Sequence, residues 1–242
     1  MLTSCETSSD AKKNNDILYL HLGGEPTFLN PILSTDAPSS SVEGLIFSGL
    51  FRFNSDLEIE PDLVEDYKVN QAETEYVFKI KKTVKWHDGH PLTAHDVKFT
   101  FDKILDKNTN TVRRSNFILD GEPITFFLID DYTIKVVLPK PFAPFLNRMA
   151  MGILPKHILN DQDINKSSFN RSPIGTGPYK FNSWQSAQFV QLDRYDDYHF
   201  GTPKTKHIIM KIIPDSNTAL LSLEKGEIDE TGIPPKDYDR YS

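Results

Sequence analysis

Hydrophobic and polar positions alternate along several short stretches of the chain. In residues 74–80, Tyr76, Phe78 and Ile80 alternate with mostly charged neighbours, a pattern typical of a strand with one face on a core and the other in water. Residues 81–86 are expected to extend this strand or to pair with it. Short apolar runs predict further strands over residues 17–22, 124–129, 132–138, 179–184, 188–194, 207–213 and 228–229.

Other stretches carry apolar residues at helical spacing. Residues 40–51 predict a helix with Ser41 as its cap. A second helix is expected to begin after Thr93, with Asp96 completing a capping box, and to end near Asp106. Two more helices are predicted, a short one at residues 145–149 and one that runs from a cap at Asp215 or Ser216 to Gly226. Strands and helices together indicate a mixed α/β fold.

Composition narrows the class of protein. The 242 residues are 38% hydrophobic and carry a formal net charge of −7. No window approaches the roughly 18 consecutive apolar residues of a membrane span. Acidic and basic residues are mixed along the chain, so nucleic acid is not an expected partner. We expect a monomer.

The single cysteine, Cys5, excludes an internal disulfide. Residues 2–5 (Leu-Thr-Ser-Cys) resemble the end of a bacterial lipoprotein signal, in which the cysteine becomes the lipidated amino terminus. The charged start and the apolar region of such a signal are absent, and a chance cysteine in a floppy terminus is the alternative. We predict lipidation at Cys5, with residues 1–15 as a disordered tether.

The densest polar cluster covers residues 86–96 and includes three histidines and two aspartates. Its spacing matches no short metal motif, because His90 and His95 stand on either side of a turn and a helix cap. A turn built on Gly89 and Pro91 accounts for the segment by itself. We therefore interpret it as structural and assign no metal ligand.

Two further motifs also lack the chemistry of an enzyme. Gly175 and Gly177 are not followed by the Lys-Ser or Lys-Thr of a phosphate loop, and Pro178 leads into a strand. A crossing between subdomains, where glycines allow close backbone approach, explains them better. No Gly-x-Ser-x-Gly motif is present. We expect no catalytic residue, no enzymatic activity and no cofactor.

Five stretches, in order, are similar to the signature of the family 5 extracellular solute-binding proteins, whose members carry oligopeptides, dipeptides, nickel complexes and some glycans. They are residues 25–31, 49–65, 78–97, 174–179 and 223–229, the last reading Leu-Glu-Lys-Gly-Glu-Ile-Asp. The resemblance covers nearly the whole chain from Asp16 onward.

The resemblance implies a periplasmic-binding-protein-like fold of type II. Residues 16–50 and 168–242 would form one lobe, with 51–167 inserted as a smaller α/β subdomain. Full-length members are about twice as long, so the chain would be the amino-terminal half of such a protein, ending near the crossover to a second lobe that it lacks.

The resemblance also implies a function. The protein would be the substrate-binding component of an ABC importer, located in the periplasm or, anchored through Cys5, on the outer face of the cytoplasmic membrane. It would clamp a peptide at the lobe interface, mainly through the peptide's main-chain groups, and deliver it to a membrane permease. The residues that match ligand contacts of the family are Glu25, Pro26, Thr27, Phe117, Thr231, Gly232 and Ile233.

Three alternatives remain open at this point. A nickel or metal-chelate carrier of the same family fits the seven histidines. A metal-dependent hydrolase would use His87, His90 and His95. An isolated half-protein could serve as an interaction or antigen module. We expect residues 1–242 alone to bind peptides weakly or not at all, because one lobe cannot enclose a ligand.

Overall fold

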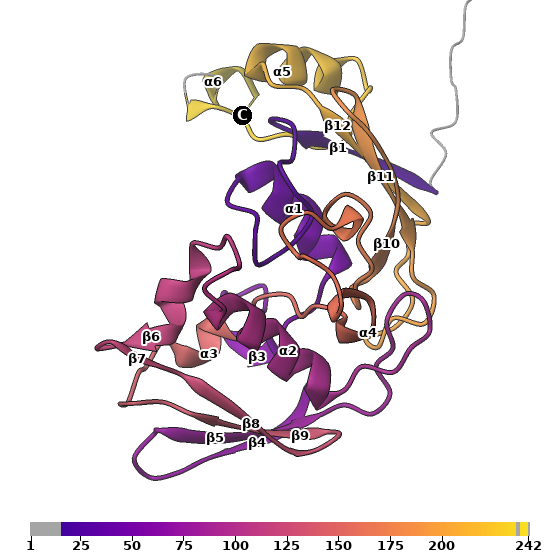
Figure 1. The fold of residues 1–242 in the computed structure, drawn as a ribbon. Helices are drawn as coiled ribbons and strands as arrows, with labels where there is room; N and C mark the ends of the chain where they lie inside the picture. Colours follow the sequence, from indigo (N-terminus) through magenta and orange to yellow (C-terminus); the bar gives the residue numbers. More distant parts are fainter. Residues whose placement is uncertain (1–15, 236–237, 242) are drawn as a thin grey trace, which may run out of the picture.

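The computed structural model describes residues 16–235 and 238–241, and Cys5 with the predicted tether lies outside them. Two four-stranded sheets and the helices packed on them confirm the mixed α/β prediction (Figure 1). The first sheet has the order β1-β12-β11-β10, with strands β1 (Ile17–Leu22), β10 (Tyr179–Gln185), β11 (Phe189–Arg194) and β12 (His207–Ile212). The second has the order β4-β5-β9-β8, with strands β4 (Val64–Val69), β5 (Glu75–Ile80), β8 (Thr125–Asp130) and β9 (Thr133–Val137).

Smaller elements complete the described fold. They are the strand pairs β2 (Phe51–Phe53) with β3 (Ile59–Pro61) and β6 (Ile118–Leu119) with β7 (Glu122–Pro123), the short helices α3 (Phe145–Arg148), α4 (Lys156–Leu159) and α6 (Tyr238–Tyr241), and the 3-10 turns η1 (Arg113–Phe117) and η2 (Ser168–Asn170).

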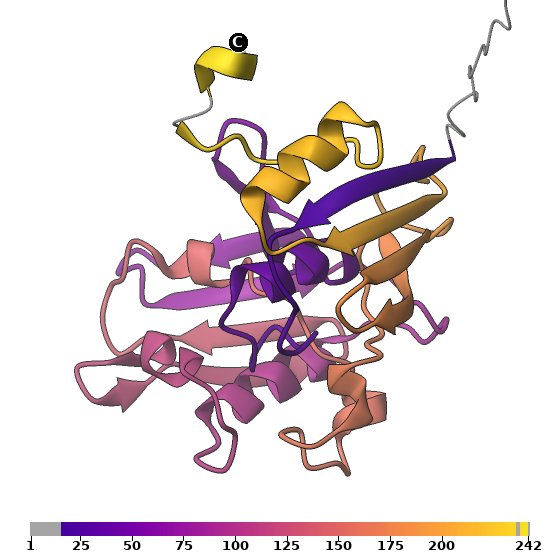
Figure 2. The same cartoon turned by 90° about the horizontal axis from the view of Figure 1, so that it is seen from above.

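The first sheet joins segments that are far apart in the chain. β1 pairs in parallel with β12, whereas β12, β11 and β10 pair antiparallel. Helices α1 (Ala37–Ile46) and α5 (Ser216–Glu224) lie on either side of this sheet (Figures 1 and 2). Asp215 caps α5 by accepting a hydrogen bond from the Thr218 amide (2.8 Å), and Gly226, with φ +71°, follows its end as predicted.

The second sheet is covered by α2 (Ala94–Leu105), which begins as predicted. Thr93 and Asp96 form the capping box, with the Thr93 amide donating to the Asp96 carboxylate at 2.9 Å. Phe101 of α2 stacks on Phe126 of β8, with ring centroids 4.2 Å apart. This apolar contact packs the helix against the sheet.

Three predicted elements differ in the structure. The helix expected over residues 40–51 begins earlier, because Asp36, not Ser41, caps it by accepting from the Ser39 amide (2.8 Å). It also ends earlier, at Ile46, where the backbone of Phe47 becomes extended. Residues 81–86 form no strand, and β5 pairs instead with β4 and β9. Residues 228–229 form no strand either; Glu230 makes a single bridge with Leu20.

The two sheets are held together where residues 175–177 cross the end of α1. The Gly177 amide donates to the Ile46 carbonyl (2.7 Å), and the His87 amide donates to the Gly175 carbonyl (2.9 Å). The buried side chains of Asp62 and His199 also meet, at 2.6 Å. Buried hydrophobic residues from both sheets form one continuous cluster. The proposed division at residues 51–167 stays a prediction.

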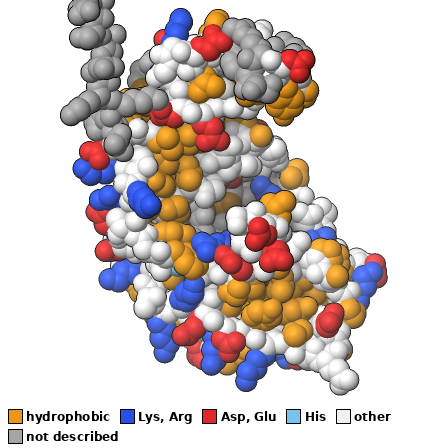
Figure 3. Space-filling model, turned by 180° about the vertical axis from the view of Figure 1, so that it is seen from behind, with side chains coloured by type: hydrophobic (Ala, Val, Ile, Leu, Met, Phe, Trp, Pro, Cys, Tyr) orange, Lys and Arg blue, Asp and Glu red, His pale blue; other side chains and the backbone are white. Residues whose placement is uncertain are grey.

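The surface agrees with the composition. Figure 3 shows basic and acidic side chains interspersed over the face it presents, without a continuous basic stripe. Among the described residues, no helix is both long enough and apolar enough to cross a membrane.

Candidate functional site

Two hollows border α1, one on each side of the helix. Ser40, Glu43, Gly44 and Phe47 follow one another at helical spacing and line a pocket of about 440 Å³, which we call the Glu43 pocket. Ser41 and Leu45 belong to the other side of the helix and line a second hollow of about 290 Å³, the His21 pocket. α1 is therefore a wall shared by two candidate binding sites.

The Glu43 pocket is formed mainly by α1, η1, α3 and the segment that follows α3. Its remaining lining residues are Pro31, Arg113, Asn116, Phe117, Asn147, Arg148, Ala150, Met151 and Gly152. The lining combines apolar side chains (phenylalanine and methionine) with the polar side chains of asparagine and arginine. This combination suits a ligand that has both apolar and polar parts.

Glu43 is unusual in this pocket because it carries an ionisable carboxyl group and is nevertheless only 6% exposed. Its Oε2 accepts a hydrogen bond from the Ser34 hydroxyl (2.8 Å), while Oε1 is buried without a hydrogen-bond partner among the described residues. Burial raises the pKa of Glu43 to about 7, although the Ser34 bond and the nearby Arg113 charge oppose the shift.

Arg113, which also lines the pocket, is only partly satisfied. It donates from Nη2 to the Ser34 carbonyl (3.1 Å), and its Nε is buried without a partner among the described residues. Ser34 thus bonds to both charged residues, and the pocket holds unsatisfied polar atoms of each sign.

We predict that Glu43 makes the stability of the protein depend on pH. Its pKa is higher in the folded state, about 7, than the ordinary 4.5, so the folded state binds more protons between these values. Stability therefore falls as pH rises from about 4.5 to about 7, by about 1–3 kcal/mol, and is constant above. Glu43→Gln is expected to be more stable than wild type by this amount at pH 8 and nearly equal at pH 4.5, measured by urea unfolding.

Glu75→Gln is the matched control for this measurement. Glu75 is 44% exposed and pairs with Lys135 at 2.9 Å, so its replacement should change stability by less than about 1 kcal/mol at either pH. A Glu43→Gln effect of equal size at pH 4.5 and pH 8 would contradict the assignment.

The His21 pocket is built around a hydrogen-bonded chain. His21 of β1 bonds through Nε2 to the Ile213 carbonyl (2.8 Å), so Nε2 carries the proton and Nδ1 is free to accept. The Thr231 hydroxyl then donates to Nδ1 (2.8 Å). The pocket is completed by Leu20, Met210, Glu230 and Gly232.

The predicted ligand contacts fall into two groups around α1. Thr231 and Gly232 line the His21 pocket, and half-buried Ile233 follows them. Phe117 is buried, lines the Glu43 pocket and packs on Phe101 with ring centroids 5.1 Å apart. Their contact with a ligand stays a prediction.

The loop after β1 also borders α1. The Thr27 amide donates to the Ser39 hydroxyl at 3.0 Å, Pro26 is buried, and the Thr27 side chain is exposed. Both carboxylate oxygens of Glu25 accept hydrogen bonds from the β10–β11 hairpin, one from Trp184 Nε1 (2.9 Å) and one from the Ala187 amide (2.7 Å). In this conformation Glu25 fastens the loop to the hairpin, and its role as a ligand contact stays a prediction.

The structure does not form the histidine site that a hydrolase would need. His87 is half-buried and bonded at both nitrogens, to the Gly175 amide (3.2 Å) and the Gly177 carbonyl (3.0 Å). Burial lowers the pKa of His87 to about 4, so the ring is neutral and structural. His95 bonds separately to Asp131 at 3.2 Å. The alternative based on His87, His90 and His95 is therefore wrong.

Sequence reasoning missed Glu43, Arg113 and His21. For Glu43 the sequence offered one signal: the residue lies beside Val42 and Ile46, on the apolar side of a predicted helix, where a charged residue is unexpected. No local pattern marks Arg113 or His21, because their partners lie far along the chain.

Comparison with known proteins gives consistent matches. Residues 58–242 match the family described as bacterial extracellular solute-binding proteins, family 5 Middle. The chain is 36% identical, over 242 residues, to the oligopeptide-binding protein AppA of Bacillus subtilis. The aligned region covers 98% of this chain and 44% of AppA. The chain thus spans less than half the length of this relative.

Solved structures resemble the chain as well. The structure of AppA from Bacillus subtilis in complex with a nonapeptide matches with a TM-score of 0.87 and 35% identity, covering 93% of this chain and 45% of that one. NikZ from Campylobacter jejuni in complex with Ni(L-His) matches with a TM-score of 0.82 and 34% identity, covering 88% and 42%.

Proposed function

Because the chain belongs to the bacterial extracellular solute-binding proteins of family 5, we propose that it is part of the substrate-binding component of an ABC importer. That component captures oligopeptides or dipeptides outside the cytoplasmic membrane and delivers them to a membrane permease. The similarity to a structure that holds a nonapeptide carries this proposal. Solute binding of this kind is not enzymatic, and no catalytic residue is assigned.

The proposed architecture follows the two sheets. Residues 16–50 and 168–242 contribute the first sheet with α1 and α5, and residues 51–167 contribute the second sheet with α2. We assign the first group to one lobe of a type II binding protein and the second to an inserted subdomain. The longer relatives contain additional sequence, in which we place the opposing lobe.

In this proposal the ligand lies along α1 and reaches both the Glu43 pocket and the His21 pocket. The predicted contacts Thr231, Gly232 and Phe117 line these two hollows. An extended peptide offers main-chain donors and acceptors at regular intervals, so it can bond to the protein independently of its side chains. Ordered water in the pockets would tolerate varied side chains.

The remaining parts of the proposal concern location. A lipid anchor at Cys5 would hold the protein at the outer face of the cytoplasmic membrane, or within the periplasm where an outer membrane is present. We propose a monomer that binds no nucleic acid, in keeping with its net charge of −7.

Filling the Glu43 pocket tests the function. Gly44 lines the pocket, and a Cβ added there meets nothing within 4 Å, so Gly44→Phe should occupy the pocket without disturbing α1. We expect at least a 10-fold loss of affinity for a nonapeptide, measured by calorimetry on the protein as its gene encodes it. Gly44→Ala is the matched control and should bind normally, since alanine favours a helix.

Two results would overturn parts of this proposal. Normal peptide affinity in Gly44→Phe would remove the Glu43 pocket from the binding site. Binding of Ni(L-His) by a protein that binds no peptide would replace peptide capture with nickel-chelate capture, the alternative that the similarity to NikZ supports.

A further inference from the structure

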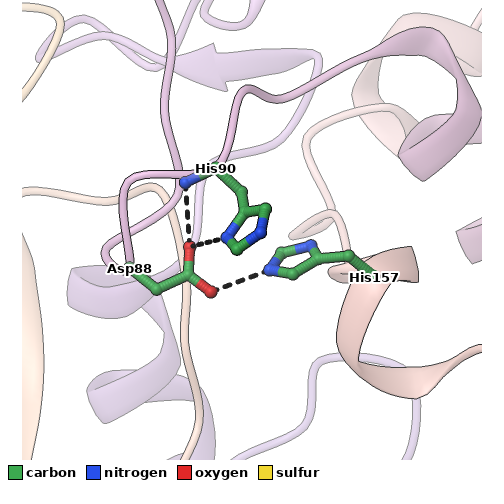
Figure 4. Close-up of side chains that lie close together, drawn as sticks. All are labelled: Asp88, His90 and His157. Atoms are coloured by element: carbon green, nitrogen blue, oxygen red, sulfur yellow. Dashed lines mark hydrogen bonds and ion pairs between the residues drawn. The ribbon is translucent and has the colours of Figure 1, made fainter.

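Asp88, His90 and His157 form a cluster away from the pockets around α1. Asp88 and His90 belong to the turn before α2, and His157 is on α4 (Figure 4). Each offers one ligand atom, and the three atoms lie within 4.8 Å of one another. We propose that these residues bind one divalent transition-metal ion, with zinc as the best fit.

The distances are close to those of a metal site. Asp88 Oδ1 lies 3.3 Å from His90 Nδ1, and Asp88 Oδ2 lies 2.8 Å from His157 Nε2. Metal–ligand bonds of about 2.0–2.2 Å in a tetrahedral site separate ligand atoms by roughly 3.3 Å. Both histidine nitrogens already face the same carboxylate, so an ion would replace the protons that they share with it.

The rings need one adjustment to bind the ion. They are stacked, with centroids 4.3 Å apart and planes inclined by 24°, and two ligand nitrogens must point at one ion from different directions. The His90 side chain is 61% exposed, so it can rotate at little cost. His157 is held more firmly, beside the fully buried Trp86, whose ring centroid lies 6.0 Å away.

The ligand types select the class of metal. Two imidazoles and one carboxylate suit zinc, nickel or copper, whereas magnesium and calcium prefer oxygen ligands throughout. The fourth position would face solvent and a neighbouring hollow of about 460 Å³, whose rim includes His95 and Asp161. The turn supplies only two of the three ligands and the third comes from α4, so no short sequence motif marks this site.

A bound ion would fasten the turn at residues 88–90 to α4. Metal that binds only the folded state raises its melting temperature. With free Zn²⁺ at about 100 times its dissociation constant, we expect the melting temperature of the untagged protein to rise by roughly 5–10 °C. Calorimetric titration should give one equivalent of Zn²⁺, and the same concentration of Mg²⁺ should change nothing. A titration with no saturable Zn²⁺ binding would overturn the proposal.

Variants identify the ligands. His90→Ala should weaken Zn²⁺ binding at least 10-fold, which reduces the thermal shift at the same Zn²⁺ concentration by about half or more. The substitution leaves the hydrogen bond between Asp88 and His157 in place. His207→Ala is the matched control, since His207 forms a similar partly exposed pair with Asp193 (2.8 Å). Cys5→Ser, which removes the single cysteine of these 242 residues, should also bind normally.

Two outcomes would show that these residues are not the ligands. In the first, His90→Ala binds Zn²⁺ with an affinity within 3-fold of wild type. In the second, His207→Ala or Cys5→Ser loses Zn²⁺ binding and His90→Ala keeps it. Neither bears on peptide capture, which Gly44→Phe tests separately.

Discussion

Replacing Gly175 with alanine is expected to destabilise the protein by about 3–5 kcal/mol. A Cβ at this position would lie 2.7 Å from the Ile46 carbonyl carbon and closer still to its oxygen. Both atoms belong to the backbone at the end of α1, and the same oxygen accepts the hydrogen bond from the Gly177 amide. The clash therefore cannot be relieved by a side-chain rotation, and the crossing between the sheets must open.

Urea unfolding followed by circular dichroism measures this effect. Gly23→Ala is the matched control, because an added Cβ there meets nothing within 4 Å, and its stability should lie within about 0.5 kcal/mol of wild type. If Gly175→Ala unfolds within about 1 kcal/mol of wild type, the close approach described here is not maintained in solution.

Removing Asp62 is expected to cost about 3–5 kcal/mol, because it leaves a buried polar partner unpaired. The Asp62 and His199 side chains are only 6% and 4% exposed, and their Oδ1 and Nε2 atoms are 2.6 Å apart. Asp62 lies between β3 and β4, and His199 lies in the connection from β11 to β12. The pair thus joins the regions of the two sheets, and Asp62→Ala should lower the melting temperature.

An exposed pair of the same chemistry provides the comparison. Asp193 and His207 are 32% and 41% exposed at 2.8 Å, so Asp193→Ala should cost no more than about 1 kcal/mol. A double-mutant cycle with His199→Ala isolates the coupling within the buried pair. Equal losses for Asp62→Ala and Asp193→Ala would show that burial adds nothing to this interaction.

Features that depend on neighbouring residues could be predicted from the sequence. The capping box of Thr93 and Asp96, the neighbouring strands of the β8–β9 and β10–β11 pairs, and Gly226 after α5 each need residues only a few positions apart. The start of α1 was misplaced because Asp36 and Ser41 are both good caps, and the sequence alone does not rank them. β4 was missed because five of its six residues are exposed at a sheet edge, so it lacks an alternating pattern.

The candidate site was less predictable than the fold. Family resemblance pointed to Thr231 and Phe117, which line the two hollows beside α1. Glu43 and Arg113 meet across Ser34 from segments separated by 70 positions, and His157 reaches Asp88 from a similar distance along the chain. Such contacts depend on how the elements pack, which local patterns do not encode.

The parallel pairing of β1 with β12 also affects how the molecule can fold. β1 is made first among the described strands, yet its partner is made after all the others. The paired positions Ile17 and His207 are 190 residues apart, so β1 has no described partner strand until that distant segment is available. The second sheet can assemble in the meantime from local hairpins. Closure of the first sheet then requires a long loop to form, which makes it the slow step of folding.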